Sequence, residues 1–173
     1  SIYIIGGGTV GVEIAQLLAI FGTKVYIADI AGRLLPSFDS EAGELLATVL
    51  HDNKGVTALT QTRTLAIEKE NIAHRVTYSR GGHEHSLRVD DVLIAAGRTP
   101  NVDLGLENAG LEYSAKGIMV NNMLQTSAKH IYATGAVLGR GGHTHTALLE
   151  SRIAANNILR KGKITPDYTG TPD

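Results

Sequence analysis

The sequence of 173 residues contains no cysteine, which excludes a disulfide framework and any thiol chemistry carried by this chain itself. A surplus of one charge sign is absent too: the formal net charge is −1, which favours neither nucleic acid nor an anionic membrane as a partner. Long hydrophobic runs are also missing, because the longest uncharged apolar region, from Ile14 to Thr23, is too short to span a bilayer.

The length of 173 residues suits one ordinary domain or one and a half small ones. With 43% apolar and 19% charged residues, the chain can form a hydrophobic core. The chain begins at Ser1, at the edge of a predicted buried strand, so we expect it to be a segment of a longer protein. With no signal peptide ahead of that strand, we expect that protein to be cytoplasmic.

A strand, a glycine turn and a helix open the chain. Ile2 to Ile5 predict a buried strand, and a GxGxxG pattern filled by Gly6, Gly8 and Gly11 follows directly. The predicted helix has its apolar face at i, i+3, i+4 and i+7, in Ile14, Leu17, Leu18 and Phe21. Lys24 to Ala28 then predict a second strand that ends in an acidic residue. This order within about thirty residues is the arrangement of a dinucleotide-binding site.

Each part of this unit has a physical reason. Gly6 permits a tight turn, Gly8 lets the backbone approach a pyrophosphate, and Gly11 lets the helix lie close to the sheet. Thr9 and Val10 begin the helix, where unpaired N–H groups and the positive end of the helix dipole favour the pyrophosphate.

The acid that ends the second strand is Asp29, followed by Ile30. Its carboxylate can accept a hydrogen bond from a ribose 2′-hydroxyl, whereas a 2′-phosphate would meet like charge. Asp29 therefore favours NAD over NADP, although Arg33 keeps NADP as the alternative. The same unit could instead bind a flavin adenine nucleotide or no ligand.

The next segments predict an α/β half followed by β structure. A loop over 30–38, a helix beginning at Asp39 or Ser40 and a strand over 56–59 complete a βαβαβ order. An antiparallel meander then takes the place of a crossover helix, with strands predicted over 63–69, 74–79 and 84–89. The apolar run 92–96 predicts a central parallel strand, which ends in a turn containing Gly97 and Arg98 beside the expected dinucleotide.

A domain boundary is predicted near residue 100. Beyond it we expect a hairpin over 111–120, a strand over 130–133 and a helix over 146–160. The tail, 163–173, has little to bury and is interpreted as a linker.

Five motifs carry a resemblance to a known family. They are IIGGGTVGVEIA at the start, GRLLPSFDSE at 32–41, VLIAAGRTPN at 92–101, GLENAGLEY at 105–113 and HIYATGAV at 130–137. In this order and spacing the chain resembles the FAD-dependent pyridine nucleotide-disulfide oxidoreductases, the family of dihydrolipoamide dehydrogenase, glutathione reductase and mercuric reductase.

The resemblance implies an α/β fold in three layers, with a Rossmann-like parallel sheet and an antiparallel β-meander crossover, followed by a partial FAD-domain segment. Residues 1–100 would be the NAD(P)-binding domain, 101–162 the incomplete C-terminal part of the FAD-binding domain, and 163–173 a linker.

The resemblance also implies roles for single residues. Asp29 matches the acid placed on the adenosine ribose, while Ile30 and Pro36 stand where NADP-dependent members place arginines. Glu13 matches a glutamate that pairs with a lysine beside the flavin and the nicotinamide; without the family it reads as a solvated helix residue.

The chain departs from the family at Gly135-Ala136, where the pattern ATGD has its aspartate on the ribityl chain of the flavin. Ala136 removes one charge-assisted hydrogen bond, on the order of 1.5 to 3 kcal/mol. The first flavin-binding strand and helix, the redox cysteine pair, the lysine partner of Glu13 and the dimerisation domain with its His-Glu pair are missing from this chain.

The implied function is hydride transfer from NADH through FAD to a disulfide or similar acceptor, or the reverse, in a homodimeric parent. The chain alone is expected to bind nucleotide without turnover. A non-catalytic or regulatory dinucleotide-binding module is the alternative, as is a disulfide-independent NADH oxidase or ferredoxin reductase relative.

Two HxH pairs, at His83 and His85 and at His143 and His145, raise the question of a metal. Their flanks differ and they fall in different predicted domains, so we expect neither an internal repeat nor a metal site. His145 matches a family position near the flavin.

Overall fold

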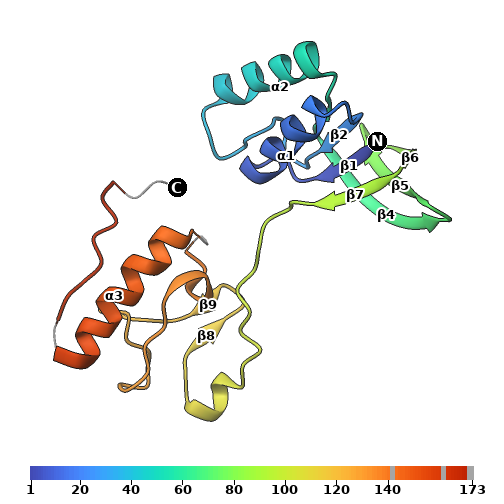
Figure 1. The fold of residues 1–173 in the computed structure, drawn as a ribbon. Helices are drawn as coiled ribbons and strands as arrows, with labels where there is room; N and C mark the ends of the chain where they lie inside the picture. Colours follow the sequence, from blue (N-terminus) through green and yellow to red (C-terminus); the bar gives the residue numbers. More distant parts are fainter. Residues whose placement is uncertain (141–142, 161–162, 171–173) are drawn as a thin grey trace. The chain divides into compact units, whose positions relative to one another are not determined.

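The computed structural model describes residues 1–140, 143–160 and 163–170, which form two compact units (Figure 1). The first unit is Ser1–Gly97 and the second is Arg98–Asp173. Each unit has its own hydrophobic core. No helix in the described ranges is long and apolar enough to cross a membrane.

A four-stranded parallel sheet lies at the centre of the first unit. Its strands are β1 (Ile2–Ile5), β2 (Val25–Ala28), β3 (Thr57–Leu59) and β7 (Asp91–Ile94), in the order β3-β2-β1-β7. β1 lies between two neighbours and has Tyr3 and Ile4 fully buried, as expected for a parallel strand covered on both faces.

Two helices cover one face of this sheet. They are α1 (Thr9–Ile20) and α2 (Ser40–Lys54). Successive strand residues point to opposite faces, so this core contains one alternate set from β1 and β2. Its buried residues are Ile4, Val12, Ala15, Val25, Ile27, Leu34, Leu50 and Val56.

An antiparallel sheet covers the other face. It consists of β4 (Thr62–Glu70), β5 (Ala73–Arg80) and β6 (His83–Val89), paired in that order. Here Tyr3 packs in a cluster with residues such as Val76 and Val89. Burial raises the pKa of Tyr3, whose hydroxyl lies 3.2 Å from Thr64 Oγ1. The predicted α/β fold with a parallel sheet and an antiparallel meander is therefore confirmed.

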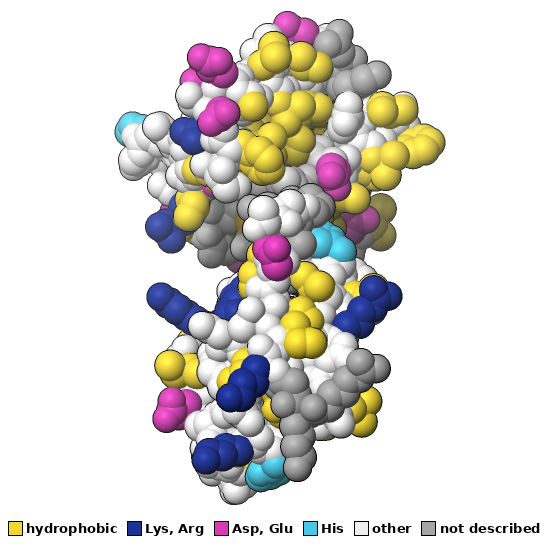
Figure 2. Space-filling model, turned by 90° about the vertical axis from the view of Figure 1, so that its left-hand side faces the viewer, with side chains coloured by type: hydrophobic (Ala, Val, Ile, Leu, Met, Phe, Trp, Pro, Cys, Tyr) yellow, Lys and Arg dark blue, Asp and Glu magenta, His cyan; other side chains and the backbone are white. Residues whose placement is uncertain are grey.

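Two details of the first unit differ from the sequence prediction. α1 buries Val12 and Ala15 on the sheet, whereas Leu17 and Phe21 of the predicted apolar face are exposed, Phe21 by 77%. The small residues face the sheet because the helix lies close to it, and hydrophobic side chains gather on the surface of this unit instead (Figure 2). The predicted central strand is also wrong in position: β7 pairs only with β1 among the described strands, and Ile94 is 71% exposed.

The second unit has one long helix and short irregular elements. They are η1 (Leu106–Ala109), β8 (Tyr113–Ser114), β9 (Gly117–Ile118), η2 (Gly135–Leu138) and α3 (Thr144–Arg160). The predicted hairpin is confirmed as β8 and β9. The strand predicted over 130–133 is wrong, because this segment forms only an isolated bridge between Gln125 and Tyr132. Its backbone closes a local turn instead, with the Ile131 N–H donating to the Ala128 carbonyl at 2.8 Å.

The segment over residues 163–170, predicted to be a linker, is hydrogen-bonded to α3. The Asn157 amide donates to the Ile164 carbonyl at 2.9 Å and accepts from the Ile164 N–H at 2.9 Å. Farther along, the Tyr168 hydroxyl donates to Glu150 Oε1 at 2.7 Å. Burial and the Glu150 carboxylate both raise the pKa of Tyr168. Composition could not reveal this docking, because it depends on two buried polar side chains of α3.

The Asn157→Ala substitution is expected to lower the free energy of unfolding by about 1 to 3 kcal/mol, because it removes a buried amide that makes three hydrogen bonds to part-buried backbone groups of Met123 and Ile164. Urea denaturation followed by circular dichroism measures this. Asn156→Ala is the matched control, since the Asn156 amide donates to the Arg152 carbonyl within the helix. Equal losses for both variants would contradict the assigned role of Asn157.

Candidate nucleotide site

A cleft of about 650 Å³ opens in the first unit at the carboxyl ends of the parallel strands. The glycine turn after β1, the loop after β2, the start of β4 and the residues after β7 form its walls. This is the edge at which open α/β sheets bind ligands. The lining residues are Ile5, Gly6, Gly8, Thr9, Val10, Ala28, Asp29, Ile30, Ala31, Pro36, Thr62, Arg63, Thr64, Ala95, Ala96 and Gly97.

The structure requires glycine sterically at two of the three pattern positions, Gly6 and Gly11, and leaves open space at the third, Gly8. Gly6 has φ +109°, and a Cβ there would lie 2.5 Å from the Ala95 carbonyl oxygen. Gly11 is buried, and a Cβ there would collide with the Gly6 carbonyl oxygen. Gly8 has open space around the same position, with nothing within 4 Å. The turn is therefore closely packed at Gly6 and Gly11 and open at Gly8.

The N-terminus of α1 lies at this open side. Gly8 is the N-cap, and among the residues that the structure describes no side chain caps the helix there. The first N–H groups of a helix have no partner inside it, so those of Thr9 and Val10 remain available at the cleft. With the positive end of the helix dipole, they form a site that suits a phosphate group.

Asp29 lies at the carboxyl end of β2 and lines the cleft. Its Oδ2 accepts the Gly7 N–H at 2.6 Å and its Oδ1 accepts the Ala31 N–H at 2.7 Å. The neighbouring Ile30 is exposed into the same cleft. A partly buried carboxylate therefore stands beside the glycine turn.

Arg33 is engaged in the loop that follows β2. One terminal nitrogen of its guanidinium donates to the carbonyls of Pro36 at 3.1 Å and Phe38 at 3.0 Å. Its Nε is buried and has no hydrogen-bond partner among the residues that the structure describes. Arg33 is not one of the residues lining the cleft. The guanidinium therefore holds the loop together through hydrogen bonds to its carbonyls.

The wall formed by β4 was missed by the sequence analysis. Thr62, Arg63 and Thr64 lie there because β4 begins three residues after the end of β3, at the carboxyl edge of the sheet. That short connection was readable in the sequence as a strand end followed by polar residues. Arg63 brings a cation to the cleft, opposite in charge to Asp29.

The remaining predicted residues lie outside this cleft. Glu13 is exposed on α1 and does not line it. Arg98 is exposed and begins the second unit, which also contains Gly135 and Ala136. Glu150, only 1% exposed, accepts the Gly135 N–H there at 2.5 Å. The hollow beside Gly135 and Ala136 has a volume of about 10 Å³, which holds one water molecule at most.

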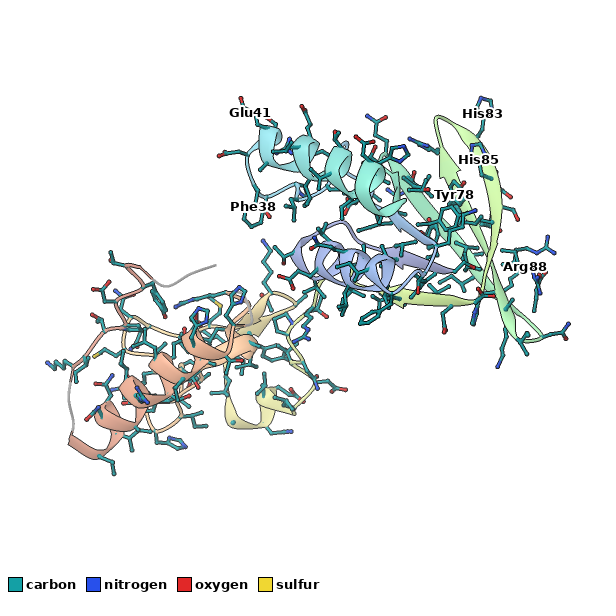
Figure 3. The ribbon with its side chains drawn as sticks, turned by 45° about the horizontal axis from the view of Figure 1, so that its top comes forward. Phe38, Glu41, Tyr78, His83, His85 and Arg88 are labelled. Carbon is teal, nitrogen blue, oxygen red and sulfur yellow. The ribbon has the colours of Figure 1, made fainter. Side chains whose placement is uncertain are left out.

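The two histidine pairs make ring-stacking contacts. His85 stacks on Tyr78 with ring centroids 5.4 Å apart, and both lie with His83 on the antiparallel sheet (Figure 3). His143 stacks on His145 at 5.5 Å. Across residues 1–140, 143–160 and 163–170, no group of three or more His, Cys, Asp or Glu side chains is placed to hold a metal ion.

Comparison with known proteins agrees with the fold. Residues 1–151 match the family described as pyridine nucleotide-disulphide oxidoreductase, so the chain belongs to that family. It is 38% identical over 158 residues to a dihydrolipoyl dehydrogenase of Bacillus subtilis, covering 91% of this chain and 34% of that protein. It is 38% identical over 167 residues to the probable pyridine nucleotide-disulfide oxidoreductase RclA of Escherichia coli, covering 95% of this chain and 36% of that protein.

A solved structure gives the same result. The copper(II) complex of the HOCl-induced flavoprotein disulfide reductase RclA from Escherichia coli matches with a TM-score of 0.85 at 34% identity. The match covers 96% of this chain and 37% of that one. The chain thus spans about a third of the length of these relatives.

The Gly11→Ala substitution is expected to lower the free energy of unfolding by about 1 to 3 kcal/mol or more, because its Cβ meets the backbone of Gly6, which has no room to move. Gly8→Ala is expected to stay within about 0.5 kcal/mol of the unsubstituted chain, since Gly8 has φ −75° and open space. Urea denaturation measures both. A loss at Gly8 as large as at Gly11 would contradict this geometry.

Proposed function

We propose that residues 1–97 bind NAD(H). The observation that carries this proposal is the open space over Gly8 at the uncapped N-terminus of α1, in a cleft that also contains Asp29. The N–H groups of Thr9 and Val10 would bind the pyrophosphate, and the free lone pairs of the Asp29 carboxylate would accept from the adenosine ribose. The cleft volume is within the range of cofactor sites.

Three observations support NAD over NADP. A 2′-phosphate near Asp29 would meet like charge, and Arg33 is engaged with the loop carbonyls of Pro36 and Phe38. Ile30 and Pro36 line the cleft with apolar surface where a cation would otherwise recognise that phosphate. Arg63 is the specific reason that NADP remains the second candidate, because it brings a positive charge to the cleft.

For the longer protein we propose the family reaction, in which hydride passes from NADH through FAD to a disulfide or similar acceptor, or in reverse. NAD(H) supplies the hydride, while the residues of this chain bind and orient it and exclude water from the cleft. We further propose that Gly97 and Arg98 lie near the bound dinucleotide, that Glu13 pairs with a lysine from outside this chain, and that the parent is a cytoplasmic homodimer.

The flavin does not fit the described residues of this chain by themselves. The hollow at Gly135 and Ala136 is the size of a water molecule, and Ala136 offers no carboxylate to the ribityl chain. We therefore propose that residues 98–162 supply one part of a flavin site, and that the chain alone binds nucleotide without turnover.

Two other functions fit specific features. A non-catalytic dinucleotide-binding module is favoured by Ala136 together with the absence of cysteine from the sequence. A disulfide-independent NADH oxidase or ferredoxin reductase relative would also need no cysteine. Reading the parent gene separates these functions, because a second GxGxxG and a CxxxxC would favour the disulfide enzyme.

Calorimetric titration is expected to show that the chain binds NAD, with NADP at least tenfold weaker and FAD not bound. Gly8→Ala should weaken NAD binding at least tenfold, about 1.4 kcal/mol, because a methyl group then occupies the space that the pyrophosphate needs.

The matched control for that titration is Gly32→Ala, at a loop glycine outside the cleft whose Cβ would make only an ordinary contact with Gln61. Its NAD affinity should equal that of the unsubstituted chain. No binding of NAD, or equal loss in both variants, would refute the proposed site. A tenfold preference for NADP would refute the assignment of the coenzyme.

A further inference from the structure

We infer that Asp29 is a positioning residue for the glycine turn, and that it affects coenzyme affinity mainly through the pyrophosphate rather than through the ribose. This inference rests on the proposed dinucleotide site. It assigns to Asp29 a task that differs from recognition of the 2′-hydroxyl and leads to a different pattern of ligand affinities.

The geometry shows a clamp between two segments that are distant in sequence. The Asp29 carboxylate joins the glycine turn to the loop after β2, because its two oxygens accept the N–H groups of Gly7 and Ala31 at 2.6 and 2.7 Å. Charge-assisted hydrogen bonds of this length are stronger than those between neutral groups. The carboxylate therefore fixes the turn that leads into α1.

Gly7 is held from its other side as well. Its carbonyl accepts the Leu35 N–H at 2.8 Å, so both of its backbone groups are bound to the segment after β2. Gly7 is buried, and a Cβ there would lie 2.8 Å from Leu34 Cδ2 and 3.2 Å from Asp29 Cβ. Gly7 occupies a variable position of the GxGxxG pattern, yet its N–H and its carbonyl are both hydrogen-bonded to the segment after β2.

The consequence concerns the next residues along the chain. Gly8, Thr9 and Val10 follow Gly7 directly, and the last two carry the N–H groups proposed for the pyrophosphate. Releasing Gly7 lets these donors move, and any ligand that depends on them loses affinity. A ligand without phosphate does not depend on them.

Asparagine is the informative replacement, since a carboxylate accepts at both oxygens whereas an amide accepts at one and donates at the other. In Asp29→Asn one of the two backbone N–H groups then faces an amide N–H. The amide oxygen can still accept from a ribose hydroxyl. The variant thus breaks half of the clamp while it keeps an acceptor near the ribose.

The experiment titrates the whole chain and its Asp29→Asn variant with NAD, ADP, NADP and adenosine, following adenosine by NMR. NAD and ADP should bind at least tenfold more weakly to the variant, and adenosine should stay within twofold. NADP should fall less than NAD, because the substitution also removes the like charge near its 2′-phosphate. Asp52→Asn, at an exposed position on α2, removes the same charge and should leave all affinities unchanged.

Two results would overturn the inference: an equal loss for adenosine and ADP, or unchanged NAD affinity. Amide hydrogen exchange without ligand tests the clamp separately. Exchange at Gly7 or at Ala31 should be at least tenfold faster in Asp29→Asn, because one of these two N–H groups loses its acceptor, and unchanged exchange at both would refute the clamp. A chain that binds neither NAD nor ADP would refute the proposed function, while hydrogen exchange would still decide about the clamp.

Discussion

The close approach of α1 to the sheet is the constraint on which the first unit depends. Gly11 packs under the Gly6 carbonyl, where no side chain could fit, and Gly6 turns beneath the Ala95 carbonyl at a positive φ. This contact brings the N-terminus of α1 to the carboxyl edge of β1. The cleft exists there because the turn is closely packed at Gly6 and Gly11 but leaves open space at Gly8.

The two units differ in the contacts that surround the residues predicted to bind cofactors. In the first unit, apolar layers on both faces of the parallel sheet leave a large cleft at its carboxyl edge. In the second, buried polar side chains of α3 hold neighbouring segments: Glu150 binds Gly135 and Tyr168, while Asn157 binds Ile164. These buried hydrogen bonds fix the positions of the segments next to α3, and the hollow beside Gly135 is too small for a large ligand.

The sequence predicted the features that depend on local pattern. Gly6, Gly8 and Gly11 could be placed because their spacing follows the dinucleotide-binding pattern, in which two positions need glycine for packing and Gly8 leaves space for a ligand. Asp29 could be placed because it ends an apolar strand. Of the predicted apolar face of α1, Ile14 and Leu18 do pack against the core. The sequence could not predict that Val12 and Ala15 are buried while Leu17 and Phe21 are exposed, because close packing favours the smaller side chains.

The parts of the site that were not predicted depend on tertiary contacts. Thr62 to Thr64 reach the cleft only because β3 and β4 are joined by a short turn. Arg33 looked like a candidate for a 2′-phosphate, yet its guanidinium binds two carbonyls of its own loop. The strand predicted over 130–133 failed because that backbone closes a local turn.

The central claim is that a dinucleotide binds over the glycine turn of the first unit. The most direct measurement is an amide chemical-shift titration of the isotope-labelled chain with NAD. The account predicts that the largest shifts fall on Gly8, Thr9 and Val10, with Gly135 unaffected. Shifts that leave Gly8 to Val10 unchanged, or that centre on Gly135, would contradict it.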